Sequence, residues 1–164
     1  MKRAHFSLAL PKWHEWLVYV SVALLTLTGA AWLLLDRFGK VEGEFGPERH
    51  PALPWLLAGH GVLAYAFLII AAMLVPVHMR LGWRTARNRR SGLALVLAGL
   101  FLAATALLLY YASAEGLRSL TSLLHWSVGT TLPLLLILHV ARGKAARVRE
   151  RAAARSAHAN KSTP

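Results

Sequence analysis

The sequence predicts an all-α membrane protein, a transmembrane four-helix bundle with both termini in the cytoplasm. Three observations lead to this prediction. The chain of 164 residues is 56% hydrophobic, it nevertheless has a formal net charge of +12, and its apolar residues gather into four long runs. A soluble domain rarely combines such hydrophobicity with such charge, whereas a membrane protein with basic ends does so naturally.

Each apolar run is long enough, at about 1.5 Å of helical rise per residue, to cross the roughly 30 Å hydrocarbon core of a bilayer. No Lys, Arg or Asp lies inside a run, and Glu15, at the start of the first, is the only Glu. A helix satisfies its own backbone hydrogen bonds in lipid, so each run predicts a transmembrane helix. The expected helices are residues 13–35, 55–79, 91–111 and 120–141, within one transmembrane domain of residues 1–143.

The basic residues predict the orientation. Fifteen of the nineteen lie at the N-terminus, in the second connection or in the C-terminal tail, namely Lys2, Arg3, Lys12, Arg80, Arg84, Arg87, Arg89, Arg90, Arg142, Lys144, Arg147, Arg149, Arg151, Arg155 and Lys161. The positive-inside rule therefore places both termini in the cytoplasm. Because these residues all lie on one side of the bilayer, we expect membrane lipid and no nucleic acid as their partner. We expect residues 144–164 to be a basic, disordered cytoplasmic tail.

With this orientation, the histidines of the four spans fall into two layers. His60 and His125 lie near the outer face, and His14, His78 and His139 lie near the inner face. His125 and His139 are fourteen positions apart on one helix. That spacing corresponds to about 21 Å of rise and to almost four full turns, so the two side chains point the same way from two depths.

Ionisable residues inside a membrane are expensive to bury and usually functional. Two imidazoles from facing helices can hold a haem iron between them, so two layers predict two haems stacked across the bilayer. The chain has no cysteine, which excludes disulfides, thiolate-held iron–sulfur clusters and covalent c-type haem. Any haem is therefore held without covalent bonds, and the paired layers predict two haem b groups. Single histidines can instead hydrogen-bond between helices. Zinc is disfavoured, because neither layer adds a cysteine or a buried carboxylate.

Two segments resemble a known family. "KWHEWLVYVSVALLTLTGAAWLL" and "LLHWSVGTTLPLLLILH" resemble the first and last helices of bacterial four-helix di-haem b-type cytochromes. This superfamily includes bacterial cytochrome b561 and the cytochrome b subunits of membrane formate dehydrogenases and nickel–iron hydrogenases. The resemblance covers roughly residues 10 to 143. It implies that His14 and His139 hold the iron of the inner haem, and that His60 and His125 hold the iron of the outer haem.

His78 is an alternative ligand of the inner haem. It follows His60 by eighteen positions and shares its helix face, but on a straight helix it lies about 6 Å too deep for the layer of His139. His14 has Gly29 one haem spacing further along, where a missing side chain would let a macrocycle approach. We therefore expect His14 to be the ligand, and His78 and Arg80 to face the propionates of the inner haem.

Bis-histidine iron has no open coordination position, which favours electron transfer over oxygen binding. The resemblance implies an electron-transfer subunit of a respiratory complex in the bacterial inner membrane, rather than a stand-alone enzyme. Electrons would pass between quinone, near the inner haem, and a periplasmic redox partner that docks on the loop of residues 36–51. A different class of function stays open: a haem-free assembly subunit or small transporter whose histidines bond neighbouring helices or relay protons.

Overall fold

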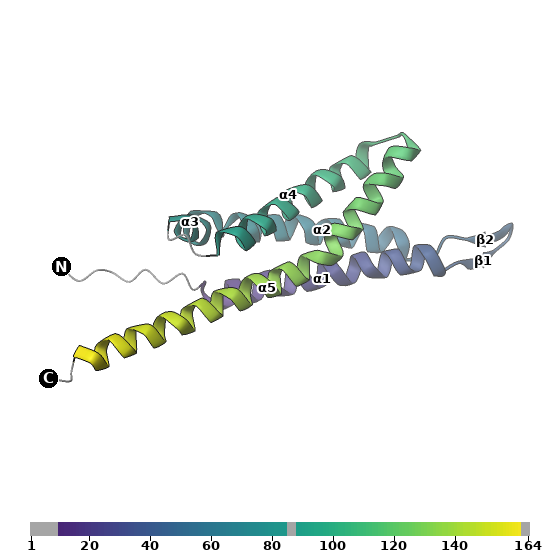
Figure 1. The fold of residues 1–164 in the computed structure, drawn as a ribbon. Helices are drawn as coiled ribbons and strands as arrows, with labels where there is room; N and C mark the ends of the chain where they lie inside the picture. The colour runs from purple at the N-terminus through teal and green to yellow at the C-terminus, as the bar shows by residue number, and fades with distance from the viewer. Residues whose placement is uncertain (1–9, 85–87, 162–164) are drawn as a thin grey trace.

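The computed structural model describes residues 10–84 and 88–161 and is built almost entirely of helices (Figure 1). Four of them are long and apolar enough to cross a membrane. Their bounds are Lys12–Phe38 for α1, Leu53–Ala72 for α2, Arg89–Tyr111 for α4 and Glu115–Lys161 for α5. The predicted fold class, an all-α bundle of four membrane-spanning helices, is confirmed.

The four helices form two helical hairpins. α1 packs chiefly against α2, α4 packs chiefly against α5, and the two hairpins meet mainly where α1 contacts α5. α1 begins, and α5 ends, on the same side of the bundle (Figure 1). No large side chain of the described segments is fully buried. This interior is therefore looser than the close-packed core of a typical globular protein.

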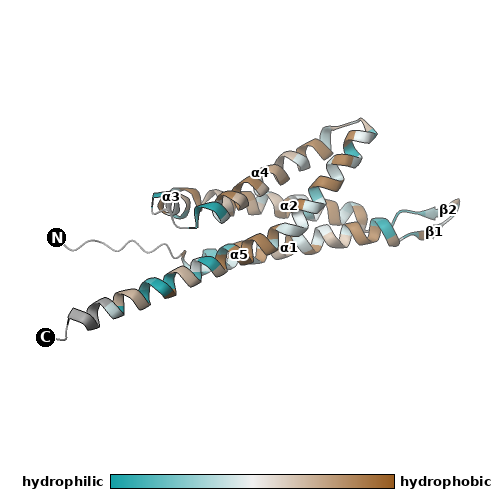
Figure 2. Cartoon of the chain, in the orientation of Figure 1, coloured by the Kyte–Doolittle hydropathy of each residue, from teal (hydrophilic) through white to brown (hydrophobic). Residues whose placement is uncertain are grey.

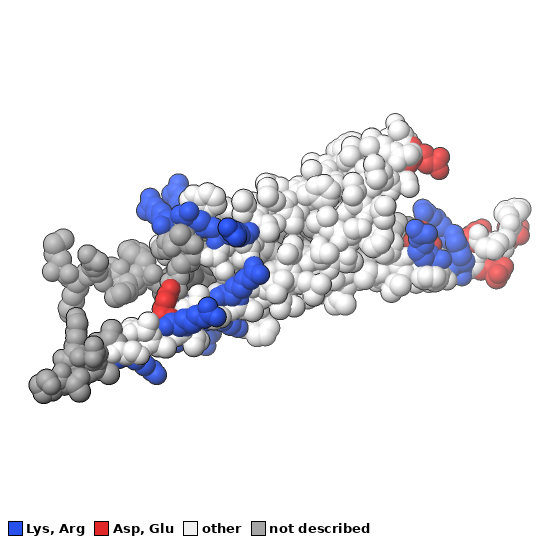
Figure 3. Space-filling model, viewed as in Figure 1, with Lys and Arg blue, Asp and Glu red and all other residues white. Residues whose placement is uncertain are grey.

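Charge is confined to the two ends of the bundle. Lys and Arg gather where α4 begins and α5 leaves the bundle, and a broad band without charge separates them from the opposite end (Figure 3). The helices within that band are predominantly apolar (Figure 2). We call the first end the basic end. The opposite end, which carries a β-hairpin between α1 and α2, we call the hairpin end.

The hairpin is the one part of the loop between α1 and α2 with regular structure. Strands β1 (Val41–Gly43) and β2 (Gly46–Glu48) pair antiparallel, with Val41 opposite Glu48. Gly46 has a φ of 115°, a conformation that a residue with a side chain rarely adopts. Phe45, at the tip, is 92% exposed. The sequence predicted an outer loop here but no strands.

The second predicted helix, residues 55–79, is interrupted. α2 ends at Ala72, and the chain then forms a five-residue π-helix, η1 (Val75–Met79), followed by the short helix α3 (Arg80–Arg84). Met79 donates its backbone N–H to the carbonyl of Leu74, five residues back, at 3.0 Å. Pro76 lies in this stretch and has no backbone N–H to continue an α-helix. Such π segments often occur at functional sites.

The C-terminal segment also differs from its prediction. We expected residues 144–164 to be disordered, but α5 continues without a break to Lys161. Alanine and arginine dominate this stretch, and both are strong helix formers. A helix that continues from a membrane span does not have to nucleate again, so good propensity is sufficient to extend it. Residues 162–164 lie outside the described part of the chain.

Candidate cofactor site

Two histidine pairs face each other between α2 or its continuation η1 and α5. At the hairpin end, the rings of His60 and His125 lie with their centroids 6.5 Å apart and their planes at 72°. At the basic end, the rings of His78 and His139 lie 6.2 Å apart at 71°. We call these the hairpin-end pair and the basic-end pair. The two pairs lie in the two layers predicted from the sequence, but the partner of His139 is His78 and not His14.

The change concerns His14. The sequence favoured His14 as the partner of His139, with His78 as the alternative, but the structure brings His78 against His139. His14 is only 5% exposed, its Nε2 lies 3.1 Å from the carbonyl oxygen of Ile70, and its ring stacks on Trp13. The geometry of His14 is therefore that of a polar side chain joining α1 to α2.

The depth argument against His78 failed because it assumed an uninterrupted α-helix from His60. The helix instead changes to the wider π form after Leu74, which alters both the rise and the direction of the side chains that follow. Pro76 was the only local sign of this change, and a proline in a membrane helix more often produces a simple kink. The position of His78 thus depends on a feature that periodicity alone does not predict.

A hydroxyl group holds three of the four facing rings. Nδ1 of His60 lies 2.9 Å from Oγ1 of Thr28 on α1, and Nδ1 of His125 lies 2.8 Å from Oγ1 of Thr105 on α4. Nδ1 of His139 lies 2.9 Å from Oγ of Ser91, also on α4. Each of these three histidines is thus held by the other helix of its own helical hairpin: α1 holds the ring on α2, and α4 holds the two rings on α5.

The direction of these hydrogen bonds follows from a second hydrogen bond that each hydroxyl forms within its own helix. Thr28 donates its proton to the carbonyl of Leu24, and Thr105 donates to the carbonyl of Phe101, each at 2.8 Å. A hydroxyl has one proton, so its oxygen is then left to accept from the imidazole. The network therefore assigns the proton to Nδ1 of the histidine and leaves a lone pair on Nε2.

Ser91 acts in the same way at the basic end, where its hydroxyl donates to the carbonyl of Asn88 at 3.2 Å. Within the described residues, no hydrogen bond involves Nε2 of the three hydroxyl-bonded rings, His60, His125 and His139. A neutral imidazole that donates through one nitrogen and keeps the other open is the form that binds a metal ion. These three rings therefore have the form in which a histidine can bind a metal ion.

Thr105 and Ser91 were missed in the sequence, although a signal was present. Ser91 and Thr105 are fourteen positions apart on α4, just as His125 and His139 are on α5. In an antiparallel hairpin, residues equidistant from the turn lie at the same depth. Both hydroxyl–histidine pairs are centred on residue 115, at the start of α5. The repeated spacing could therefore have identified both partners.

The ring separations fit an iron between each pair. A metal–imidazole bond is about 2.0–2.1 Å long, and a ring centroid lies about 1.1 Å from its nitrogen, so two rings on opposite sides of one ion have centroids about 6.3 Å apart. The observed separations are 6.5 and 6.2 Å. Among the described residues, no group of three or more His, Cys, Asp or Glu side chains could hold a metal ion. A haem needs only two protein ligands, because its macrocycle supplies four.

The glycines next to the histidines make room for the rings themselves. A Cβ added at Gly29 would lie 3.2 Å from Cε1 of His60, which is closer than most such contacts. A Cβ at Gly92 would lie 3.5 Å from Cε1 of His139. The sequence predicted that Gly29 admits a macrocycle, and in the structure its neighbour is the His60 ring. Arg80, the predicted propionate partner, is exposed at the start of α3.

Comparison of the chain with profiles of known protein families, with characterised proteins and with solved structures finds no match. The functional interpretation therefore rests on the residues and geometry described above.

Proposed function

We propose that this protein is a membrane di-haem b-type cytochrome that carries electrons across the bilayer. The observation that supports it most directly is the pair of facing imidazoles at each end of the apolar band, spaced for one iron atom. His60 and His125 would hold one haem, and His78 and His139 would hold the other. Haem supplies one-electron chemistry when bound, and six-coordinate iron leaves no position for oxygen.

The chain contributes the position and the electronic setting of each ligand. Thr28, Thr105 and Ser91 keep the proton of the bonded imidazole on Nδ1, which raises the basicity of Nε2. The charge-free helices around both pairs would exclude water and lower the local dielectric when embedded in lipid. The fourteen-residue spacing of His125 and His139 separates the two sites by about 21 Å along α5. Two sites at these depths form a path from one membrane face to the other.

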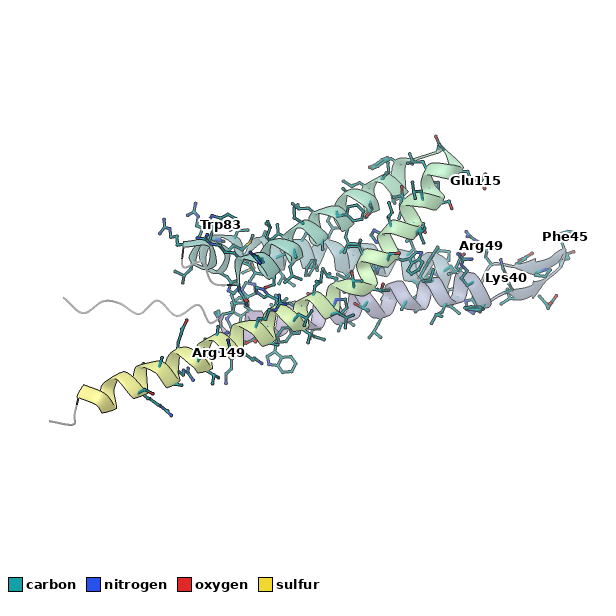
Figure 4. The ribbon with its side chains drawn as sticks, in the orientation of Figure 1. Lys40, Phe45, Arg49, Trp83, Glu115 and Arg149 are labelled. Carbon is teal, nitrogen blue, oxygen red and sulfur yellow. The ribbon has the colours of Figure 1, made fainter. Side chains whose placement is uncertain are left out.

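The predicted orientation assigns each site to one side of the membrane. With the basic end in the cytoplasm, the basic-end pair lies on the inner side of a bacterial inner membrane. Electrons then pass between quinone, near the inner site, and a periplasmic redox protein at the hairpin end. The loop between α1 and α2 is the natural docking surface for that protein, because its hairpin extends beyond the helices with Phe45 exposed (Figure 4).

Haem content tests the proposal. Protein purified from cells with sufficient haem is expected to bind two haems per chain by pyridine haemochrome assay. Acid–acetone is expected to extract all of it, since no cysteine can form a thioether. Paramagnetic resonance is expected to show two low-spin ferric signals. Protein without a Soret band or a reduced-minus-oxidised α-band would instead identify a haem-free assembly subunit or transporter, in which the histidines join helices or relay protons.

A further inference from the structure

An open pocket of about 450 Å³ lies at the basic end, beside the basic-end histidine pair. It is lined by Asn88, Arg89, Arg90, Ser91 and Arg142. Asn88 caps α4 and Ser91 lies in its first turn, while Arg142 follows His139 on α5 by three residues. The pocket is thus formed where α4 and α5 leave the apolar band, and lipid headgroups would lie at this level if that band spans the hydrocarbon core.

No acidic side chain of residues 10–84 or 88–161 forms an ion pair with the arginines of this pocket. Arg89 donates from its Nε to the carbonyl of Trp83 at 2.8 Å, and its guanidinium lies 5.4 Å from the centre of the Trp83 ring. Within the described segments, neither Arg90 nor Arg142 forms an ion pair with an acidic residue. The ion pair between Arg49 and Asp36 lies at the other end of the bundle, the hairpin end. Two guanidinium groups therefore remain available for an external anion.

A second open pocket, of about 490 Å³, is lined by Val75, Met79, Arg80, Trp83 and Arg84. Its wall is predominantly apolar. Trp83 belongs to this pocket, while Arg89, which lies over the Trp83 ring, belongs to the first, so the two pockets are neighbours. An apolar groove next to a cluster of cations at the membrane surface has the chemistry of a phospholipid: acyl chain on one side, phosphate on the other.

We propose that this double pocket is a specific site for an anionic phospholipid, with its phosphate bound by Arg90 and Arg142 and an acyl chain along Val75 and Met79. Guanidinium groups bind phosphate oxygens in bidentate geometry, and basic pockets between membrane helices select anionic headgroups. The neighbouring apolar groove favours a lipid over a free phosphate ion, because a soluble anion would leave that groove without a ligand.

The bound phosphate would influence the histidine beside it. Asn88 donates from Nδ2 to the backbone carbonyl of His139 at 2.9 Å, and Ser91 accepts from the ring of the same residue. Both side chains also line the pocket. If the proposed function holds, a negative charge here stabilises oxidised iron at the basic-end site and lowers its reduction potential. This consequence rests on the proposed function, whereas lipid binding itself does not.

The test compares two double variants with equal loss of charge. Arg90→Gln/Arg142→Gln removes the two guanidinium groups proposed to bind the phosphate and leaves Arg80 and Arg84 of the apolar groove in place. Arg149→Gln/Arg151→Gln removes two from the exposed part of α5 beyond it. Each protein is reconstituted with spin-labelled phosphatidylglycerol or phosphatidylcholine in an excess of unlabelled phosphatidylcholine. The native protein and the α5 control are expected to immobilise phosphatidylglycerol preferentially, and the pocket variant is expected to lose at least tenfold in that preference.

The conservative variant Arg90→Lys/Arg142→Lys keeps the charge and is expected to retain part of the preference, which separates binding from a folding defect. Equal immobilisation by the pocket variant and the α5 control would overturn the proposal. So would displacement of the lipid by millimolar inorganic phosphate alone, since that result identifies a site for a free anion. Lipid binding is also measured on His139→Ala protein, and haem content on every variant. If the lipid preference is retained while no form of the protein binds haem, the cytochrome proposal is refuted and the lipid site is not.

Discussion

At the scale of single residues, three hydroxyl groups decide what the histidines can do. A threonine or serine in a membrane helix normally donates back to a carbonyl of its own helix, and Thr28, Thr105 and Ser91 do so here. That local bond has a distant effect, because it commits the hydroxyl proton and leaves the oxygen as an acceptor for an imidazole on another helix. A residue that looks structurally neutral thereby selects the tautomer of a histidine on another helix.

Thr105→Val tests this role, because valine keeps the shape of threonine but cannot accept a hydrogen bond. Loss of the acceptor makes Nε2 of His125 less basic and stabilises ferric iron less. We expect the midpoint potential of the hairpin-end haem to rise, by up to about 60 mV for a tenfold change in relative affinity. Redox titration of the α-band measures it. The matched control is Thr130→Val, whose hydroxyl bonds only to its own helix. An identical shift in both variants would contradict a positioning role.

The ligands of the basic-end haem are tested by haem counts in four variants. His78→Ala and His139→Ala are each expected to bind one haem, because either change leaves the iron with a single imidazole. His14→Ala is expected to bind two, because its ring nitrogen bonds the carbonyl of Ile70 and does not face His139. His50→Ala, outside the spans, is the control and also keeps two. One haem in the His14 variant and two in the His78 variant would restore the pairing favoured by the sequence.

At the scale of elements, the π segment determines where the basic-end site forms. α2 carries His60 and would carry His78 too far along its axis if it continued as an α-helix. The change of helix type after Leu74 alters that geometry, and the ring of His78 lies opposite His139. Pro76 favours the change, since it cannot donate the α-helical hydrogen bond to Ala72. The interruption thus couples a local change of backbone to the approach of His78 and His139.

Pro76→Ala is the corresponding variant. Alanine restores the missing N–H and allows α2 to continue as an α-helix, so His78 would turn away from His139 in part of the population. We expect haem retention at the basic-end site to fall by up to about tenfold, with the hairpin-end site unaffected, as measured by haem transfer to apomyoglobin. Pro54→Ala is the matched control. It lies in the first turn of the same helix, where a proline costs no hydrogen bond. Equal losses in both variants would show that the π segment does not set the site.

At the scale of the whole molecule, the sequence predicts what depends on composition and misses what depends on contacts. Four apolar runs predicted four spans, because hydrophobic length alone determines whether a helix can cross a bilayer. The pairing of His60 with His125 followed from depth. To predict the pairing of His78 with His139, one must know that the helix becomes a π-helix after Leu74. That change depends on Pro76 and on its surroundings together. Thr105 was within reach of the sequence, because its spacing from Ser91 repeats the spacing of His125 from His139.

The tail shows the opposite error, since its composition was interpreted as disorder. Residues 144–161 are rich in charge and have no apolar face to bury, which are features of flexible segments. Their helical propensity is nevertheless high, and a continuous membrane span supplies the nucleus. Apart from Ala146, which is half-buried, the tail is exposed where the structure describes its side chains. It did not predict a lack of helix.

The orientation of the bundle is the prediction on which the inner and outer assignments of the two haems depend. The sequence predicts that four spans place both termini on one side, together with fifteen of the nineteen basic residues. Cytoplasmic loops retain such charge, so a fluorescent protein that folds only in the cytoplasm is expected to be bright when fused after Pro164. The same reporter inserted in the hairpin between Gly43 and Gly46 is expected to be dark, while alkaline phosphatase there is expected to be active. The reverse pattern would exchange the two faces: the basic-end pair would then lie next to the periplasm, and quinone would be expected at the hairpin end.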